Sequence, residues 1–231
     1  MAKKEQVRSM FNNIAGNYDF LNHFLSAGID RRWRKRVIKI LRKKQPGRIL
    51  DVATGTADLA IAESDLNPEK IVGVDIADQM LDIGREKLEK KRLTKLITLE
   101  NGDSENLRFD DGSFDAVTVA FGVRNFENLD QGLKEMHRVL DQGGTVVVLE
   151  FSRPRNFPVK QLYSFYFRYI LPLLGRIISR HDSAYTYLPE SVGSFPDGEA
   201  FISRLQKAGF TNCTHRPLTF GIATVYTGEK G

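Results

Sequence analysis

The stretch RILDVATGTADLAI, residues 48–61, decides the fold of this chain. An apolar run ends on Asp51, small residues fill positions 53–57, and a helix-like pattern resumes at Leu59. In open α/β sheets the turn after the first strand comes closest to the ligand, and small side chains let its backbone lie against that ligand. The stretch therefore predicts a ligand-binding turn, with a plain tight turn as the alternative.

Short β-branched runs alternate with helical segments after this turn, which predicts parallel strands joined by right-handed crossovers. The expected strands are 47–52, 70–76, 95–101, 113–122, 144–151, 211–218 and 220–230, and the expected helices are 58–63, 78–91, 128–140 and 197–210, the last ended by Gly209. The last two strands are close enough to pair as a hairpin. We therefore expect an α/β fold: a seven-stranded, mostly parallel Rossmann-like sheet with helices on both faces and a C-terminal antiparallel hairpin.

Composition favours one globular domain spanning residues 1–231, since 41% of the 231 residues are hydrophobic and 27% are charged. The single cysteine, Cys213, excludes an internal disulfide and a multi-thiolate metal site, and we expect it to be a strand residue without chemistry. The four histidines show no ligand-like spacing, so no metal is expected. No apolar run of about 18 residues occurs, which favours a cytoplasmic protein.

Residues 31–44 carry nine basic residues and no acid, so the rest of the chain has a net charge of −4 against +5 overall. Trp33, Val37, Ile40 and Leu41 fall on one face of a helix, with basic residues on the others. Three interpretations are open: a solvated helix with a buried apolar stripe, contact with anionic lipid headgroups, and, more weakly, a nucleic-acid surface. The stretch lacks the interleaved aromatic residues of a base-stacking platform.

The ligand at the turn is expected to carry no phosphate. Turns that bind dinucleotides show G-x-G-x-x-G and hold a pyrophosphate at the helix N-terminus. Here Ala53 and Ala57 depart from that pattern, and Asp58 would place a carboxylate beside the phosphates.

Two further strand ends complete a predicted pocket. Asp75 ends the second strand, where a carboxylate accepts hydrogen bonds from both hydroxyls of a ribose. Asp103, after the third strand, is positioned to accept a hydrogen bond from an adenine amino group, with Ser104 beside it; an Asx turn or helix cap is the alternative for Asp103. An unphosphorylated adenosine with a polar tail fits S-adenosylmethionine.

At this point the chain resembles the class I S-adenosylmethionine-dependent methyltransferases and, within them, the C-methyltransferases of ubiquinone and menaquinone biosynthesis. The resemblance covers almost the whole chain and rests on VRSMFNNIAGNYDFLNHFLSAGIDRRWR, LDVATGTADLA, GVDIADQML, AFGVRNFENLDQGLKEMHRVLDQGG, EFSRP, YFRYILPLLG and YTYLPESVGSFP. The turn is common to enzymes with many substrates, whereas FGVRN, EFSRP and YTYLPES are more specific to the quinone group. Ala53 stands where many methyltransferases have Gly, but the quinone enzymes resemble this chain there.

The resemblance implies roles for the residues at the turn and strand ends. Thr56, Asp75, Asp103 and Ser104 would contact the methyl donor, beside the backbone of Gly55. Asp51 would orient the methionine end of the donor, directly or through water; a role as a strand-end cap is its alternative.

The implied reaction moves the methyl group of S-adenosylmethionine to a ring carbon of demethylmenaquinol to give menaquinol, with the benzoquinol of the ubiquinone pathway as a second candidate substrate. A ring carbon becomes nucleophilic when the neighbouring hydroxyl loses its proton, so the substrate must be the reduced quinol. Holding that carbon about 3 Å from the methyl group would supply a large share of the rate acceleration.

Four residues are candidates for the chemistry. We expect Arg124 to stabilise the developing oxyanion and Asn125 to orient the ring oxygen; a local salt bridge and a cap on the next helix are their alternatives. Tyr18 and His23 lie in an N-terminal segment expected to fold over the cleft and are candidate proton acceptors. For His23, a structural role among apolar neighbours is the alternative.

Two regions are expected to surround this core: an N-terminal helical cover, residues 1–44, and an inserted apolar substrate-side segment, residues 157–195. Arg168, Pro172 and Arg176 exclude a simple membrane span in the insert. A core-covering helix pair is one interpretation of the insert. The others are an entrance for a polyprenyl chain involving Phe165, Phe167 and Tyr169, contact with the membrane surface, or a homodimer interface.

The expected partners are a lipophilic prenylated quinol and, peripherally, the inner face of the membrane, without nucleic acid. A nucleic-acid methyltransferase would need a base-flipping motif such as Asn-Pro-Pro-aromatic, which is absent. A methyltransferase for a small soluble phenol and a non-catalytic adenosine-binding protein remain as alternatives.

Overall fold

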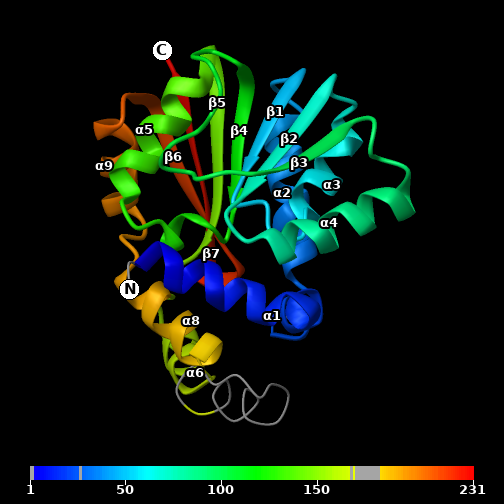
Figure 1. Ribbon diagram of the computed structural model, residues 1–231. Helices are drawn as coiled ribbons and strands as arrows, with labels where there is room; N and C mark the ends of the chain where they lie inside the picture. Colours follow the sequence, from blue (N-terminus) through cyan, green and yellow to red (C-terminus); the bar gives the residue numbers. More distant parts are fainter. Residues whose placement is uncertain (1–2, 26–27, 167–168, 170–182) are drawn as a thin grey trace.

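The computed structural model describes residues 3–25, 28–166, 169 and 183–231, and within them seven strands form one sheet in the order β3-β2-β1-β4-β5-β7-β6 (Figure 1). The strands are β1 Arg48–Val52, β2 Lys70–Asp75, β3 Ile97–Asn101, β4 Phe114–Ala120, β5 Leu140–Phe151, β6 Phe210–Leu218 and β7 Ala223–Lys230. Strands β1 to β5 pair in parallel, while β7 runs antiparallel to both β5 and β6. The predicted mostly parallel sheet with a C-terminal hairpin is confirmed.

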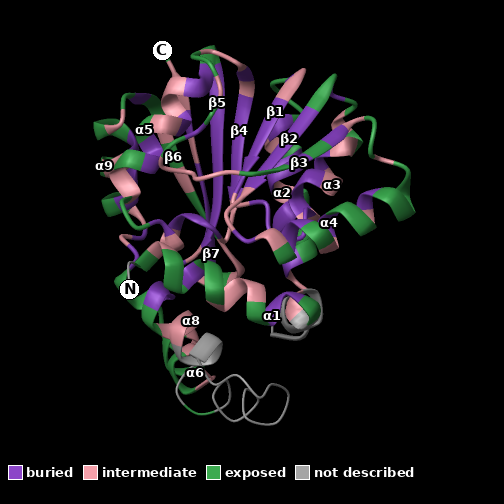
Figure 2. Ribbon diagram, in the orientation of Figure 1, coloured by how far each residue is buried: buried purple, intermediate pink, exposed green. Residues whose placement is uncertain are grey.

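Helices cover both faces of the sheet. The helices are α1 Lys3–Leu25, α2 Asp30–Leu41, α3 Asp58–Glu63, α4 Asp78–Lys91, α5 Leu129–Val139, α6 Val159–Phe165, α8 Ser183–Ser194 and α9 Glu199–Lys207, with short 3-10 turns η1 Ser64–Leu66, η2 Val123–Asn125 and η4 Thr219–Gly221. Apolar side chains of α2, α3 and α4 pack on one face, and those of α5 and α9 pack on the other. The strands between them are largely buried (Figure 2).

The two largest differences from the expected strand boundaries are the starts of β5 and β7. β5 begins four residues early because Leu140 pairs with Phe114 before the register shifts to the pair Ala116 and Thr145. β7 begins at Ala223 because the preceding residues form η4. Cys213 lies in β6, as predicted.

The packing of α2 explains why its apolar residues are spaced to fall on one face of a helix. Trp33, Val37 and Leu41 are buried against the sheet and α3, Ile40 is half-buried, and Ile38 adds a fifth apolar contact. The predicted apolar stripe is confirmed, and it leaves most of the basic side chains of α2 on the surface.

The N-terminal helix and the insert lie at one end of the sheet. In Figure 1, α1 crosses the carboxyl ends of the parallel strands, and α6 and α8 lie beyond it. Phe167, Arg168, Pro172 and Arg176 lie outside the described residues, as does most of the stretch YFRYILPLLG. Among the helices that the structure describes, none is both long and apolar enough to span a bilayer.

Candidate functional site

The turn after β1 has an unusual backbone. Ala53, Gly55 and Ala57 all have left-handed φ angles, of 53°, 56° and 65°. A larger side chain at these positions would be strained, and a Cβ added to Gly55 would lie 3.3 Å from Cε of Met80. Ala53 and Gly55 line a cavity, so two of the small residues predicted to face a ligand do face an open space, whereas Ala57 is buried.

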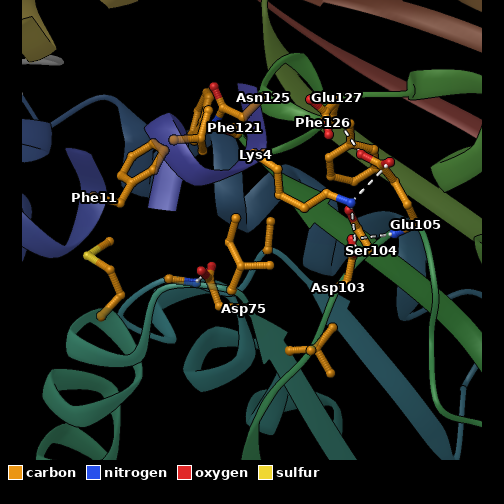
Figure 3. Close-up of a pocket in the computed structure, with 18 of the residues that line it drawn as sticks. Lys4, Phe11, Asp75, Asp103, Ser104, Glu105, Phe121, Asn125, Phe126 and Glu127 are labelled. Atoms are coloured by element: carbon orange, nitrogen blue, oxygen red, sulfur yellow. Dashed lines mark hydrogen bonds and ion pairs between the residues drawn. The ribbon is translucent and has the colours of Figure 1, made fainter. Parts of the chain in front are cut away.

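This cavity lies between α1 and the carboxyl ends of β1, β2 and β4, and holds about 650 Å³ including its part open to solvent (Figure 3). Its lining residues are Lys4, Val7, Phe11, Tyr18, Ala53, Gly55, Val74, Asp75, Ile76, Met80, Gly102, Asp103, Ser104, Glu105, Ala120, Phe121, Gly122, Asn125, Phe126 and Glu127. The structure thus brings six predicted site residues together around the cavity. Five of them are Tyr18, Asp75, Asp103, Ser104 and Asn125, and the sixth is Gly55, which contributes its backbone.

Asp75 ties the turn to the end of β2. Its Oδ2 accepts a hydrogen bond from the backbone N–H of Gly55 at 2.8 Å, and its Oδ1 accepts one from Ala77 at 2.9 Å. Burial raises the pKa of this carboxyl, and the backbone donors act in the opposite direction. The backbone N–H of Ile76 also acts on this carboxylate, whose remaining lone pair is available to a ribose hydroxyl.

Asp103 makes the Asx turn that was its alternative interpretation and also lines the cavity. Its Oδ1 accepts a hydrogen bond from the backbone N–H of Glu105 at 2.9 Å. Its Oδ2 accepts one from Nζ of Lys4 at 2.7 Å, and Glu105 lies 3.3 Å from the same ammonium (Figure 3). The hydrogen bond to Asp103 is the main reason that the pKa of Lys4 is raised. A lysine of α1 therefore occupies the oxygen that was predicted to receive an adenine amino group.

Two predicted donor contacts do not line the cavity with their side chains. Thr56 is buried, and its hydroxyl accepts a hydrogen bond from Nζ of Lys87 at 3.0 Å. Asp51 is buried behind the turn, where its Oδ2 accepts a hydrogen bond from Oγ1 of Thr54 at 2.6 Å and its Oδ1 accepts one from Thr118 at 3.4 Å. In this arrangement Asp51 supports the turn through its hydrogen bond with Thr54. Direct contact of the Asp51 or Thr56 side chain with the methyl donor stays a prediction.

Asp51 also faces a second buried carboxyl, that of Glu63 at the end of α3. Burial raises the pKa of Asp51 to about 7. Burial and the charge of Asp51 raise the pKa of Glu63 well above its usual value. Neither oxygen of Glu63 has a hydrogen-bond partner within the part of the chain that the structure describes. Burial therefore favours the neutral form of both carboxyls.

Arg124 forms the local salt bridge that was its alternative interpretation. Its Nη1 lies 2.8 Å from Oε1 of Glu150 and also donates to the carbonyl of Phe121, while its guanidinium lies 5.5 Å from the ring centroid of Phe151. The Arg124 side chain is 6% exposed and that of Glu150 is 0% exposed. Arg124 is therefore fixed beside the cavity rather than in its lining.

Asn125 lines the cavity and contacts the substrate-side segment. Its Oδ1 accepts a hydrogen bond from the hydroxyl of Tyr187 in α8 at 2.9 Å. Asn128, not Asn125, caps α5, since its side chain accepts a hydrogen bond from the backbone N–H of Gln131. The capping interpretation of Asn125 is therefore wrong.

The two N-terminal candidates have different outcomes. Tyr18 lines the cavity and meets the ring of Phe11 edge-on, at a centroid distance of 5.9 Å. The backbone of His23 lies in α1, but its side chain lies outside what the structure describes.

Sequence reasoning missed several residues of the site: Lys4, Val7, Phe11, Glu105 and Tyr187. A signal for α1 was present, because Val7, Phe11, Ala15 and Tyr18 follow one helix face, and Ala15 is buried with them at the cavity end. For Tyr187 the signal was its place in the specific stretch YTYLPES.

The lining suits a cationic nucleoside without phosphates. Its ionisable side chains are the acidic Asp75, Asp103, Glu105 and Glu127, with Tyr18 and the single cation Lys4, which already pairs with Asp103 and Glu105. A phosphate would meet repulsion here, whereas the sulfonium of S-adenosylmethionine would meet complementary charge.

Comparisons with known proteins agree with this site. A model of the ubiE/COQ5 methyltransferase family matches residues 1–230. The chain is 49% identical over 229 residues to a demethylmenaquinone methyltransferase of Bacteroides fragilis, covering 99% of this chain and 94% of that protein. It is 48% identical over 231 residues to a ubiquinone/menaquinone biosynthesis C-methyltransferase UbiE of Geobacter sulfurreducens, covering 99% and 90%.

The fold is similar to that of solved methyltransferases. The crystal structure of a S-adenosylmethionine-dependent methyltransferase of Thermotoga maritima, described as a possible histamine N-methyltransferase, superposes with a TM-score of 0.69. The superposition covers 97% of this chain and 99% of the Thermotoga maritima chain, and the two sequences are 19% identical. This likeness supports the class I methyltransferase fold.

Proposed function

The chain belongs to the ubiE/COQ5 methyltransferase family, and from this premise we propose that it transfers the methyl group of S-adenosylmethionine to a ring carbon of demethylmenaquinol, giving menaquinol. The observation that carries the proposal is the 49% identity to a demethylmenaquinone methyltransferase over 99% of the chain. The enzyme is a S-adenosylmethionine-dependent methyltransferase of quinone biosynthesis. The benzoquinol of the ubiquinone pathway is a second candidate substrate, since other relatives carry both pathway names.

When bound, S-adenosylmethionine supplies an electrophilic methyl group. Asp75 would hold the ribose through the acceptor capacity left by its backbone hydrogen bonds. Asp103 and Ser104 would lie at the adenine end, with Lys4 displaced from Oδ2 of Asp103. Val7 and Phe11 of α1 would close the cavity with apolar surface and exclude water from the reacting groups.

On the substrate side, Asn125 and Tyr187 would position the ring oxygen. The hydroxyl of Tyr187 donates to Asn125 and keeps its own lone pairs for a quinol hydroxyl. Burial raises the pKa of Tyr187 and the charge of Arg124 acts to lower it, so the tyrosine stays neutral and able to donate at pH 7. Arg124, fixed by Glu150, would favour the phenolate electrostatically as the quinol loses its proton.

We propose that the exposed apolar side chains of the insert contact the bilayer that carries the prenylated substrate. Phe157, Leu162, Phe165 and Tyr169 are all more than half exposed, with Phe157 at 81%. Water-exposed aromatic and aliphatic side chains on one short helix and its flanks suit insertion into the interface of a membrane. In Figure 1, α6 and α8 lie beyond α1, at the end of the sheet where the substrate would enter, which supports this proposal.

A substrate series tests the proposed reaction. Purified protein is incubated with S-adenosylmethionine and, in parallel, reduced demethylmenaquinol, the corresponding demethylated benzoquinol and a soluble short-chain phenol, and methylated products are quantified by mass spectrometry. The proposal predicts the greatest kcat/KM for the prenylated naphthoquinol. Preference for the soluble phenol, or no product from any quinol, would overturn it.

Vesicle flotation tests the membrane contact, with Leu162→Glu and Phe165→Glu as the disrupting changes and Lys160→Glu, on the same helix, as the control. The two apolar variants should lose vesicle binding that the control keeps. Unchanged flotation with a shift from dimer to monomer in solution would assign this face to a homodimer instead.

A further inference from the structure

The basic helix α2 contributes to a second hollow, distant from the donor cavity. Its lining residues are Arg36, Lys39 and Ile40 of α2 and Lys43 just after it, with Thr214, Arg216, Val225 and Thr227 of the β6–β7 hairpin. We call this hollow the α2–hairpin groove. It shares no lining residue with the donor cavity, so the proposed methyl transfer does not account for it.

The groove exists because one face of the hairpin is open beside α2. Strand residues alternate between faces. His215 points to the face covered by α9, where it stacks on Tyr226 and pairs with Glu199. Thr214 and Arg216 therefore project to the opposite face, beside Val225, which packs with α2.

Among the residues that the structure describes, four cations and no acidic residue line the groove. Within the described residues, none of these four cations makes an ion pair, although two neighbouring cations in the sequence do. Nη2 of Arg34 lies 2.6 Å from Oδ2 of Asp30, and Nζ of Lys44 lies 2.5 Å from Oε1 of Glu229. Glu229, the acid of the hairpin, also accepts a hydrogen bond from Asn212 at 2.7 Å. The positive charge of the groove is therefore uncompensated, and like charges held together oppose folding.

Arg36 carries a more specific sign of a ligand. Its Nε is buried and has no hydrogen-bond partner among the residues that the structure describes. A buried donor without an acceptor is unfavourable, so a shift of the Arg36 side chain that brings Nε to an acceptor in the groove would be favoured. Thr214 and Thr227 share one hydrogen bond between their hydroxyls at 2.8 Å, which leaves the second hydroxyl hydrogen for an acceptor.

From these contacts we infer that the α2–hairpin groove binds a phosphate group. Arginine forks match the geometry of phosphate oxygens, and lysines add point charges around them. A carboxylate would satisfy fewer of these donors, because it has two oxygens where a phosphate monoester has three. The ligand is a free phosphate ester or the headgroup of an anionic phospholipid, which share this chemistry.

An NMR titration tests the site in the full chain. Inorganic phosphate is added against chloride at constant ionic strength, and backbone amide shifts are followed. Saturable shifts are expected at Arg36, Lys39, Thr214 and Arg216. The double variant Arg36→Gln/Arg216→Gln should weaken binding at least about tenfold, whereas Arg31→Gln/Arg42→Gln should change it less than about threefold, since these arginines do not line the groove.

Two further measurements keep the result interpretable. Without phosphate, Arg36→Gln/Arg216→Gln should melt at or above the temperature of the unmodified chain, because it removes repulsion, and its methyltransferase activity should be unchanged. Flotation with phosphatidylglycerol and phosphatidylcholine vesicles distinguishes the two possible ligands. If Arg36→Gln/Arg216→Gln loses binding to phosphatidylglycerol vesicles and the control variant keeps it, the ligand is a lipid headgroup. If the chain binds phosphate but not phosphatidylglycerol vesicles, the ligand is a free ester. Equal effects in both double variants, or no binding of either probe, would overturn the inference.

Discussion

Nζ of Lys4 lies 2.7 Å from Oδ2 of Asp103, so the first turn of α1 holds the carboxylate that the adenine of the donor is expected to use. The same helix reaches the far side of the cavity, where Arg8 pairs with Asp78 and Asn12 accepts a hydrogen bond from the backbone N–H of Gln79. α1 is thus held over the cavity by polar contacts at both edges. Donor entry must break at least the contact to Asp103.

Replacing Lys4 should strengthen donor binding. Lys4→Met frees Asp103 for the donor, and a partly exposed ion pair of this kind is worth about 0.2–1 kcal/mol, so the Kd for S-adenosylmethionine should fall about 1.4- to 5-fold. Isothermal titration calorimetry gives the Kd. Arg8→Met is the control, because it loosens α1 without touching Asp103. Weaker binding in Lys4→Met than in Arg8→Met would show that Lys4 helps to hold the donor.

The Arg124–Glu150 pair separates stability from catalysis. Arg124→Gln leaves the Glu150 carboxyl buried and unpaired, which should cost about 3–5 kcal/mol of the free energy of unfolding. Arg124→Gln/Glu150→Gln should recover most of that stability in urea unfolding. If the charge of Arg124 favours the phenolate, the double variant should still lose at least about 100-fold in kcat. A stable double variant with normal turnover would assign Arg124 a purely structural role.

Removing the hydroxyl of Tyr187 should affect the quinol and not the donor. Tyr187→Phe loses the hydrogen bond to Asn125 and the acceptor for a quinol hydroxyl, so kcat should fall about tenfold. The Kd for S-adenosylmethionine, measured on the same preparation, should be unchanged. Equal losses in donor affinity and turnover would mean that Tyr187 acts only by holding the cavity together.

Glu63 should make stability depend on pH. Because its pKa is raised in the folded state, the folded chain binds the proton more tightly than the unfolded chain, so stability present below the ordinary pKa of about 4.5 is lost as pH rises toward the folded value. Glu63→Gln removes this loss. The variant should match the unmodified chain near pH 5 and exceed it at pH 8 in urea midpoint. An equal difference at both pH values would contradict the buried, proton-binding carboxyl.

The local sequence pattern was sufficient to predict where the residues at the strand ends lie. The small turn and Asp75 follow directly from a strand of predictable length, so their meeting at one edge of the sheet could be derived from the sequence. Asp103 was placed equally well, since it lines the cavity and forms the Asx turn that was its alternative interpretation, while its contact with adenine stays a prediction.

Contacts between distant segments could not be predicted in the same way. Lys4 meets Asp103, and Tyr187 meets Asn125, because α1 and α8 dock on the carboxyl edge of the sheet, which no short-range pattern specifies. Arg124 lies in η2. It meets Glu150 because β5 lies beside β4 and the last residues of β5 reach η2. Thr56 illustrates the remaining limit: its position in the turn was predictable, but the direction of its side chain toward Lys87 depends on the packing of α4.

The fate of a labelled methyl group tests the central claim most directly. The protein is incubated with S-adenosylmethionine carrying a deuterated methyl group and with demethylmenaquinol, either reduced or oxidised, and the product is fragmented in a mass spectrometer. The account predicts one labelled methyl on a ring carbon, formed from the reduced quinol only. A label on oxygen, or equal product from the oxidised quinone, would contradict methylation through a phenolate.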